Sequence, residues 1–226
     1  MAALENPARK KLQLLVSDMR DIADVRLGAQ LKPIIADRAR LEKALPPGAV
    51  HQGIALSVLP LEQPSLHDFI DSTAGKKHAL AVLLDQVLDP HNVGAIMRSA
   101  LAFGADAVIG THRHSAPESA VLAKSSSGAI ESLPLIEAGN LVQAMDLLKK
   151  HGFWAVGLDG SAALTLRETT LPEKIMVVMG AEGSGLRRLT AERCDYMARI
   201  DICPKVESLN VSNACAITLY EISGRR

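Results

Sequence analysis

Residues 79–110 have the sequence ALAVLLDQVLDPHNVGAIMRSALAFGADAVIG. The first six are a continuous apolar run, which is typical of a strand buried on both faces of a parallel sheet. Apolar residues then recur at helical spacing over 92–104, and ADAVIG at 105–110 predicts a second strand. A strand, a helix and another strand in succession predict an α/β fold with a mostly parallel sheet covered by helices on both faces.

The same alternation continues to the end of the chain. Further helices are predicted over 119–126, 140–151 and 210–222, and further strands over 132–136, 153–158, 174–180 and 196–202. Ligands in such sheets usually bind at the carboxyl ends of the strands. We therefore look for a site in the loops that follow residues 84, 180 and 202.

The first part of the chain has the pattern of a small α/β unit. LQLLVS at 12–17 and GIALSV at 53–58 predict strands, and ADRARLEKAL at 36–45 predicts a helix. The polar stretch DSTAGKK at 71–77 is typical of a linker. The sequence thus predicts a small domain over 1–70, a linker over 71–77, and a larger domain over 78–226.

Composition excludes several classes of protein. Lysine plus arginine and aspartate plus glutamate both total 25, so the net charge is zero and nonspecific binding of nucleic acid through a basic tail is disfavoured. Three cysteines without a C-x-x-C pair exclude a disulfide framework and a four-cysteine zinc site. There is no apolar run of roughly 20 residues and no signal peptide at the start, so we expect a cytoplasmic protein outside the membrane.

The helix predicted over 92–104 carries the first candidate site. Asn92 is a plausible N-cap, and Arg98 lies off the apolar stripe of Val93, Ile96, Met97 and Ala100. Gly94 precedes Arg98 by one turn and has no side chain, so we expect the arginine to lean over open space near the helix start. Free backbone N–H groups there could bind an anion. The alternative is a capped core helix with a solvated arginine.

Two further segments contain possible ligand-binding residues. In KIMVVMGAEGSGLRRL, 174–189, the glycines follow a strand with the spacing G-x-x-G-x-G, which fits neither the dinucleotide fingerprint nor the P-loop. They would still let the backbone approach a nucleotide-like ligand. Arg187 and Arg188 could contact phosphates or form a solvated helix face. Towards the end of the chain, Ser208 or Asn210 is expected to cap the last helix.

Taken together, these segments resemble a known family. DPHNVGAIMRSA (89–100), VMGAEGSGL (178–186) and SLNVSNA (208–214) match in order the three motifs of the SpoU class of RNA ribose 2'-O-methyltransferases, in the SPOUT superfamily. The resemblance covers 78–226. The first part resembles the family's ribosomal-protein-like RNA substrate-binding domain, including HQG at 51–53. That domain usually has another strand and most of a helix before NPARKK (6–11), so we expect it to be N-terminally incomplete here.

The resemblance implies a C-terminal trefoil knot and S-adenosylmethionine as the methyl donor. The family's cofactor contacts, mostly made by the backbone, correspond to Gly180, Gly183, Ile200 and Leu209. The family is dimeric, so we expect a homodimer with its active site near the subunit interface. No metal is needed, because the sulfonium is already activated.

The resemblance also assigns catalytic residues. Arg98 is the central one, and Asn92, Glu182, Ser208 and Asn210 match the other polar positions. Because a guanidinium stays charged in proteins, we expect Arg98 to stabilise the developing alkoxide and to grip an adjacent phosphate. Asn92 and Glu182 are expected to orient Arg98 and the ribose. Ser208 and Asn210 are expected to shape the substrate side.

The small domain and the HQG string look most like family members that methylate a guanosine of 23S rRNA. A tRNA methyltransferase of the same class is the first alternative, and a nonenzymatic RNA-binding or ribosome-assembly module with the same fold is the second. The glycine spacing disfavours a nicotinamide-dependent oxidoreductase.

Overall fold

The computed structural model describes residues 1–25, 27, 31–111 and 118–225. The chain divides into two compact units, Met1–Glu62 and Gln63–Arg226, each with its own hydrophobic core. None of the helices in the described part of the chain combines the length and the apolar character needed to cross a membrane.

The first unit contains a three-stranded sheet. Strand β1 (Lys11–Val16) lies between β2 (Pro33–Ile35), to which it is parallel, and β3 (Ile54–Val58), to which it is antiparallel. Helices α1 (Ala2–Glu5), η1 (Met19–Ile22) and α2 (Arg38–Ala44) complete the unit. The strands predicted at 12–17 and 53–58 and the helix predicted at 36–45 are confirmed. Strand β2 was not predicted, because three residues are too few to show an alternating pattern.

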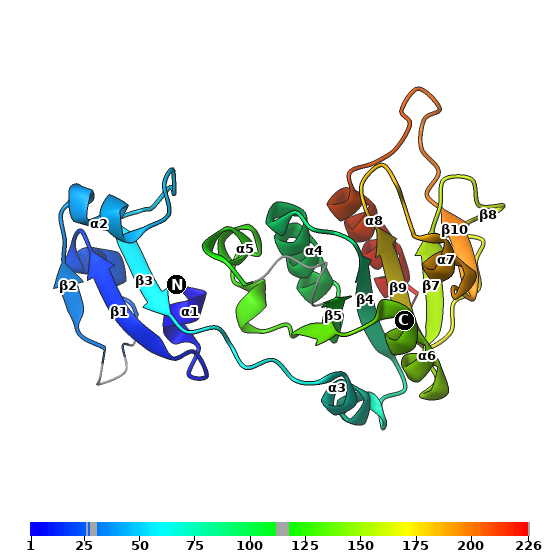
Figure 1. The fold of residues 1–226 in the computed structure, drawn as a ribbon, viewed down its shortest axis with the longest axis horizontal. Coiled ribbons are helices and arrows are strands. Elements are labelled where there is room, and N and C mark those ends of the chain that lie inside the picture. The colour runs from blue at the N-terminus through cyan, green and yellow to red at the C-terminus, as the bar shows by residue number, and fades with distance from the viewer. Residues whose placement is uncertain (26, 28–30, 112–117, 226) are drawn as a thin grey trace. The chain divides into compact units, whose positions relative to one another are not determined.

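The second unit is built on a seven-stranded sheet in which every described pair of neighbouring strands is parallel (Figure 1). The strand order is β6-β5-β4-β9-β7-β10-β8. The bounds are β4 (Ala79–Asp85), β5 (Ala107–Thr111), β6 (Leu135–Ala138), β7 (Trp154–Leu158), β8 (Leu164–Thr165), β9 (Lys174–Gly180) and β10 (Tyr196–Arg199). The predicted parallel-sheet α/β fold is confirmed.

Helices cover both faces of this sheet. Their bounds are α3 (Leu66–Thr73), α4 (Pro90–Ala102), α5 (Ala120–Ser125), η2 (Ala129–Glu131), α6 (Leu141–Lys150), α7 (Arg188–Glu192) and α8 (Val211–Ser223). In β4, the side chains of Leu80, Val82 and Leu84 join a core with α4, α5 and α8, whereas Ala79, Ala81 and Leu83 join a second core with α3 and α6. Both sets are fully buried, which explains why this strand is apolar at successive positions.

The boundary between the units differs from the predicted one. Ser65 and Asp68 form a capping box that begins α3, and Phe69 and Ile70 of this helix are buried in the second core. The polar stretch 71–77 therefore contains the end of a helix of the second unit, and the division falls between Glu62 and Gln63. The signal for the helix is the capping box at Ser65 and Asp68, which lies before this stretch. The polar composition of 71–77, taken alone, therefore suggested a linker.

Two details of α4 correct the sequence analysis. The N-cap is Asp89, whose side chain accepts a hydrogen bond from the backbone N–H of His91, so Asn92 lies inside the first turn. Gly94 is buried against α5, and a Cβ there would overlap Ser125 Oγ. The expected open space beside Gly94 is therefore filled by α5. The predicted apolar stripe is confirmed, since Val93, Ile96, Met97 and Ala100 are all fully buried.

Candidate active site

Three side chains from three segments meet through hydrogen bonds in the second unit. Asn210 Nδ2 donates to Asn92 Oδ1 at 3.0 Å, and Asn92 Nδ2 donates to Glu182 Oε2 at 3.5 Å. Asn92 lies in the first turn of α4, which follows β4, while Glu182 lies just after β9 and Asn210 caps α8. The fold thus brings Asn92 together with Glu182, which lies 90 positions further along the chain, and with Asn210, which lies 118 positions further along.

The N-cap role of Asn210 fixes the direction of its amide. Its Oδ1 accepts hydrogen bonds from the backbone N–H of Ser212 at 2.9 Å and from Ser212 Oγ at 2.6 Å. The Nδ2 group is therefore left to reach Asn92. The sequence left either Ser208 or Asn210 as the cap, and Asn210 is the one observed. Ser208 is exposed and forms no hydrogen bond with this group of residues in the described part of the chain.

Arg98 is exposed and is not hydrogen-bonded to these three residues in the described part of the chain. Its Nη1 donates to Ser127 Oγ at 3.3 Å, and the described residues show no hydrogen bond from it to Asn92 or Glu182. Six residues of helix, or about 9 Å of rise, separate Arg98 from Asn92. Sequence reasoning missed Ser127, which has a φ of +49°, unusual for a residue with a side chain. Its place in a run of three serines before Gly128 was the available signal.

The glycine-rich loop after β9 folds back on itself. The backbones of Ala181 and Gly185 exchange two hydrogen bonds, of 3.1 and 2.9 Å. Gly183 and Gly185 have φ values of +79° and +66°, which side chains disfavour. A Cβ on Gly180 would overlap the backbone of Gly185, so the loop cannot pack this closely with any other residue there. The result is a tight, exposed turn that carries Glu182.

The end of this loop is tied to the end of β4. The fully buried carboxylate of Asp85 accepts the backbone N–H of Arg187 at 2.9 Å and the Nε–H of its guanidinium at 2.6 Å. The sequence pattern singled out Arg187 but not Asp85. The signal available was the single charged residue that ends the apolar run ALAVLLD.

The segment 200–210 connects β10 to α8. Ile200 and Leu209 are half-buried, and the residues between them are exposed. In the described part of the chain, the 205–209 backbone takes part in one backbone hydrogen bond, from Val206 N–H to the Cys203 carbonyl at 3.0 Å. Its remaining N–H and C=O groups are therefore available to a ligand. No group of three or more potential metal-binding side chains occurs among the described residues.

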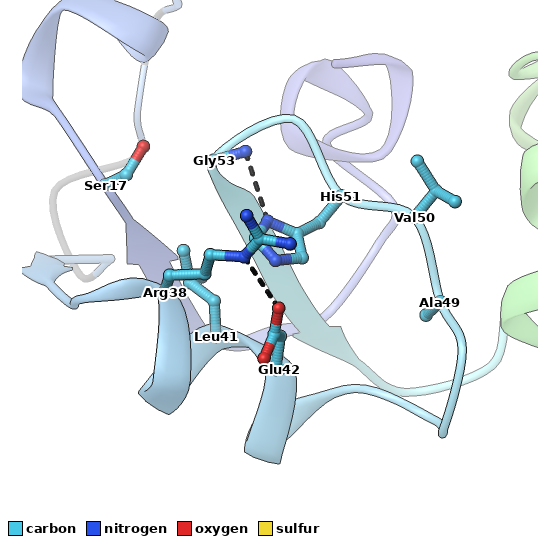
Figure 2. A pocket seen from close by; sticks show the side chains of 8 residues that line it. All are labelled: Ser17, Arg38, Leu41, Glu42, Ala49, Val50, His51 and Gly53. Atoms are coloured by element: carbon cyan, nitrogen blue, oxygen red, sulfur yellow. Dashed lines mark hydrogen bonds and ion pairs between the residues drawn. The ribbon is translucent and has the colours of Figure 1, made fainter.

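The first unit has a pocket of its own, with a volume of about 460 Å³ (Figure 2). It includes His51 and Gly53 of the HQG string, and His51 Nδ1 accepts the Gly53 N–H at 3.3 Å. Arg38 points towards the same space and forms an ion pair with Glu42 at 2.7 Å. The pocket is lined by Ser17, Arg38, Leu41, Glu42, Ala49, Val50, His51 and Gly53.

The comparisons with known proteins identify the family. The model of the SpoU rRNA methylase family matches residues 79–220, which contain Asn92, Arg98, Glu182 and Asn210. The chain belongs to the SpoU rRNA methylase family. This membership confirms the resemblance that the three motifs carry.

Individual members of the SpoU family are similar over most of the chain. The 23S rRNA (guanosine-2'-O-)-methyltransferase RlmB of Xylella fastidiosa is 38% identical over 100% of this chain and 93% of its own length. The protein of the same name from Escherichia coli is 44% identical over 79% of this chain and 74% of its own. The fold matches that of the SpoU methyltransferase AviRb from Streptomyces viridochromogenes in complex with AdoMet. The TM-score is 0.78 at 24% identity, over 100% of this chain and 86% of that one.

Proposed function

We propose that this protein transfers a methyl group from S-adenosylmethionine to the ribose 2'-hydroxyl of a guanosine in 23S rRNA. The observation that carries the proposal is the hydrogen-bonded group Asn210–Asn92–Glu182, because it joins all three SpoU motifs at one place. Family membership and the printed activity of the relatives support the same reaction. Because the proposed substrate is ribosomal RNA, we place the reaction in the cytoplasm.

The loops after β9 and β10 fit the proposed cofactor. Gly183 is exposed and has no atom within 4 Å of an added Cβ, so a ligand could approach its backbone closely. Gly180 is half-buried and lets the loop fold back on Gly185, and the backbone near Leu209 has free hydrogen-bonding groups in the described structure. We propose that the backbone at Gly180, Gly183, Ile200 and Leu209 holds S-adenosylmethionine. When bound, this cofactor supplies a methyl group on a sulfonium, which is already activated for transfer.

The chain's own residues must then position and polarise a neutral hydroxyl. We assign Arg98 to stabilising the negative charge that develops on the 2'-oxygen and to gripping an adjacent phosphate. Ser127 Oγ fixes one of its Nη groups and leaves the exposed remainder of the guanidinium for RNA. Asn92 and Glu182 orient the ribose, while Ser208 and Asn210 shape the substrate side. Holding the reacting atoms in line supplies a further large part of the rate.

We further propose that the C-terminal segment forms a trefoil knot. Strand β10 lies beyond β7, on the side away from β9, yet the chain then returns so that α8 packs against α4 and β9. This return past the carboxyl ends of the strands is the path that a knotted loop would require.

A homodimer is proposed as the working form. Leu101 of α4 and Ile217 and Tyr220 of α8 are large apolar side chains that are 40%, 43% and 67% exposed. They lie on two helices that pack against each other, so a second copy of the chain could cover them together.

The unit Met1–Glu62 is proposed as the RNA substrate-binding, ribosomal-protein-like domain. Its pocket places the exposed guanidinium of Arg38 near the imidazole of His51 (Figure 2). A guanidinium can pair with a phosphate and an imidazole ring can stack on an unpaired base, which are the features by which proteins recognise single-stranded RNA loops.

The test is transfer of labelled methyl from S-adenosylmethionine to unmodified 23S rRNA and, separately, to unmodified tRNA, with Arg98→Ala as the control. Label in 23S rRNA that requires Arg98 and maps to an alkali-resistant linkage is expected. Label in tRNA alone would identify a tRNA methyltransferase of the same class. Absence of label in both, with no binding of the cofactor, would contradict the proposal and favour a nonenzymatic RNA-binding or assembly module.

A further inference from the structure

Asp85 is a charged residue whose side chain is removed from solvent. Its side chain is fully buried at the end of the central strand β4, and both of its oxygens accept hydrogen bonds from Arg187. Burying a carboxylate is costly, and the mutual attraction of a buried ion pair often no more than offsets that cost. A pair of apolar residues could join β4 to the loop equally well. The charge therefore points to a role other than stability.

The hydrogen bonds to Asp85 fix the orientation of the Arg187 guanidinium. A guanidinium has five N–H donors in a rigid plane, and here Nε–H is directed inwards to Asp85 Oδ1 at 2.6 Å. The four N–H groups on the two Nη atoms have no acceptor among the residues that the structure describes, and the side chain is 44% exposed. Arg187 thus presents a rigid fork of donors to solvent, the geometry that binds a phosphate through two hydrogen bonds.

This fork lies at the same carboxyl edge of the sheet as the candidate active site, on the face that α6 and α7 cover. Arg187 is bonded to the last residue of β4, and α4 with Asn92 begins five residues after that strand. On its other side, Arg187 ends the tight loop that carries Glu182, which is hydrogen-bonded to Asn92. A phosphate bound at Arg187 would therefore belong to RNA that crosses this edge of the sheet to reach the site.

We propose that Arg187 binds a phosphate of the RNA backbone next to the methylated nucleotide, and that Asp85 orients it for that contact. This inference rests on the proposed function and adds a substrate-binding residue outside the five polar positions assigned from the motifs.

Arg188 is a natural comparison, because it is adjacent in sequence and differs in its surroundings. Its side chain is 75% exposed and pairs with Glu192, which is itself exposed, one turn along α7. Such a solvent-exposed pair contributes little to stability. Arg188 therefore lacks the buried anchor that would orient it for a phosphate.

The test compares Arg187→Lys with Arg188→Lys in the full chain. Arg187→Lys keeps the backbone N–H bond to Asp85 and the positive charge, but one ammonium group cannot both pair with Asp85 and present a fork. The Kd for in-vitro-transcribed 23S rRNA is measured by filter binding over a series of salt concentrations. The Tm, the Kd for S-adenosylmethionine, and the KM and kcat for methyl transfer are measured in parallel.

We expect Arg187→Lys to raise the Kd and the KM for RNA about tenfold and to reduce the salt slope by about 0.7–0.9, the contribution of one phosphate. The cofactor Kd and kcat should stay within about twofold of the wild-type values. The Tm should stay within about one degree of the wild-type Tm. Arg188→Lys should change none of these. Asp85→Asn, which keeps the shape of the anchor but removes its charge, should shift the RNA Kd in the same direction by about threefold.

Two results would overturn the inference. One is equal RNA binding by the Arg187→Lys and Arg188→Lys variants. The other is a parallel loss of Tm and cofactor affinity in Arg187→Lys, which would show that the pair only fastens the loop. A wild-type protein that transfers no methyl group to any RNA would instead contradict the proposed function, so the two failures are distinguishable.

Discussion

At the scale of single residues, Arg98 combines one fixed hydrogen bond with wide exposure to solvent. Arg98→Lys keeps the positive charge but loses the bidentate geometry, so kcat should fall about 100-fold, as for the loss of one oxyanion donor. The Kd for S-adenosylmethionine should change less than twofold. Single-turnover methyl transfer and cofactor titration measure the two quantities.

Arg167→Lys is the matched control for this prediction. Arg167 is an exposed arginine of the same unit, paired with Glu221, and has no proposed contact with substrate or cofactor. It should retain wild-type turnover. Normal turnover by Arg98→Lys would show that bidentate geometry is not needed and that the role assigned to Arg98 is wrong.

Cys215 makes stability depend on pH in alkaline solution. It is fully buried on α8, and burial raises the pKa of its thiol to about 12. In the unfolded chain a thiol releases its proton near pH 8.5, so only the unfolded state is stabilised by ionisation between about pH 8.5 and 12. The stabilising contribution is complete below this range. Within this range the free energy of unfolding should fall by about 1.4 kcal/mol per pH unit.

Urea unfolding at pH 7.5 and 9.5 tests this expectation. Cys215→Ala should show a smaller loss of stability between the two pH values than the wild type, by about 1.4 kcal/mol. The variant should still lose some stability between the two pH values, because burial also raises the pKa of the Cys194 thiol to about 12. Equal losses in wild type and variant would contradict the shift assigned to Cys215.

At the scale of elements, the contact between α4 and α5 depends on Gly94. A Cβ there would overlap Ser125 Oγ and lie 2.8 Å from the backbone nitrogen of Ser126, and backbone cannot move aside cheaply. Gly94→Ala should therefore lower the free energy of unfolding by about 2 kcal/mol, as overpacking does elsewhere. Urea denaturation is the measurement.

Gly139→Ala is the control for Gly94→Ala. Gly139 has nothing within 4 Å of the added Cβ and no positive φ, so the free energy of unfolding should change by less than about 0.5 kcal/mol. A stable Gly94→Ala protein would show that α5 can shift away from α4.

The elements that sequence predicted are those whose pattern is local. Strand β4 and helix α4 follow from a buried run and a 3.6-residue stripe, and both appear within two or three residues of their predicted bounds. The packing beside Gly94 could not be predicted locally, because α5, which fills this space, lies about 30 residues further along the chain. Strand β8 has two residues and is likewise too short to show the alternating hydrophobic pattern of a strand.

The residues of the candidate site could be predicted from the sequence, whereas some of their hydrogen-bond partners could not. The motifs singled out Asn92, Glu182 and Asn210, and the hydrogen bonds join them. The partners of the two arginines were not predicted, since Ser127 and Asp85 contact them from other segments of the fold. Single-sequence patterns report which residues are polar and locally exposed, whereas pairings across 29 or 102 positions depend on tertiary structure.

At the scale of the whole molecule, the division into two units separates two proposed tasks. The proposed cofactor loops and the proposed catalytic group lie entirely within Gln63–Arg226, and the HQG pocket lies entirely within Met1–Glu62. The chain has no net charge, so RNA affinity must come from a few placed contacts rather than from a general attraction. Removing one set of contacts should then have a large and selective effect.

A variant that lacks residues 1–62 should separate cofactor binding from RNA binding. The second unit has two cores of its own around the seven-stranded sheet, so it should fold and bind S-adenosylmethionine with a Kd within about threefold of the full chain. Its KM for 23S rRNA should rise at least about tenfold, because the proposed RNA contacts at Arg38 and His51 are gone. Arg38→Ala in the full chain should shift KM in the same direction with less effect. If the shortened variant methylates 23S rRNA with an unchanged KM, the first unit does not bind the substrate.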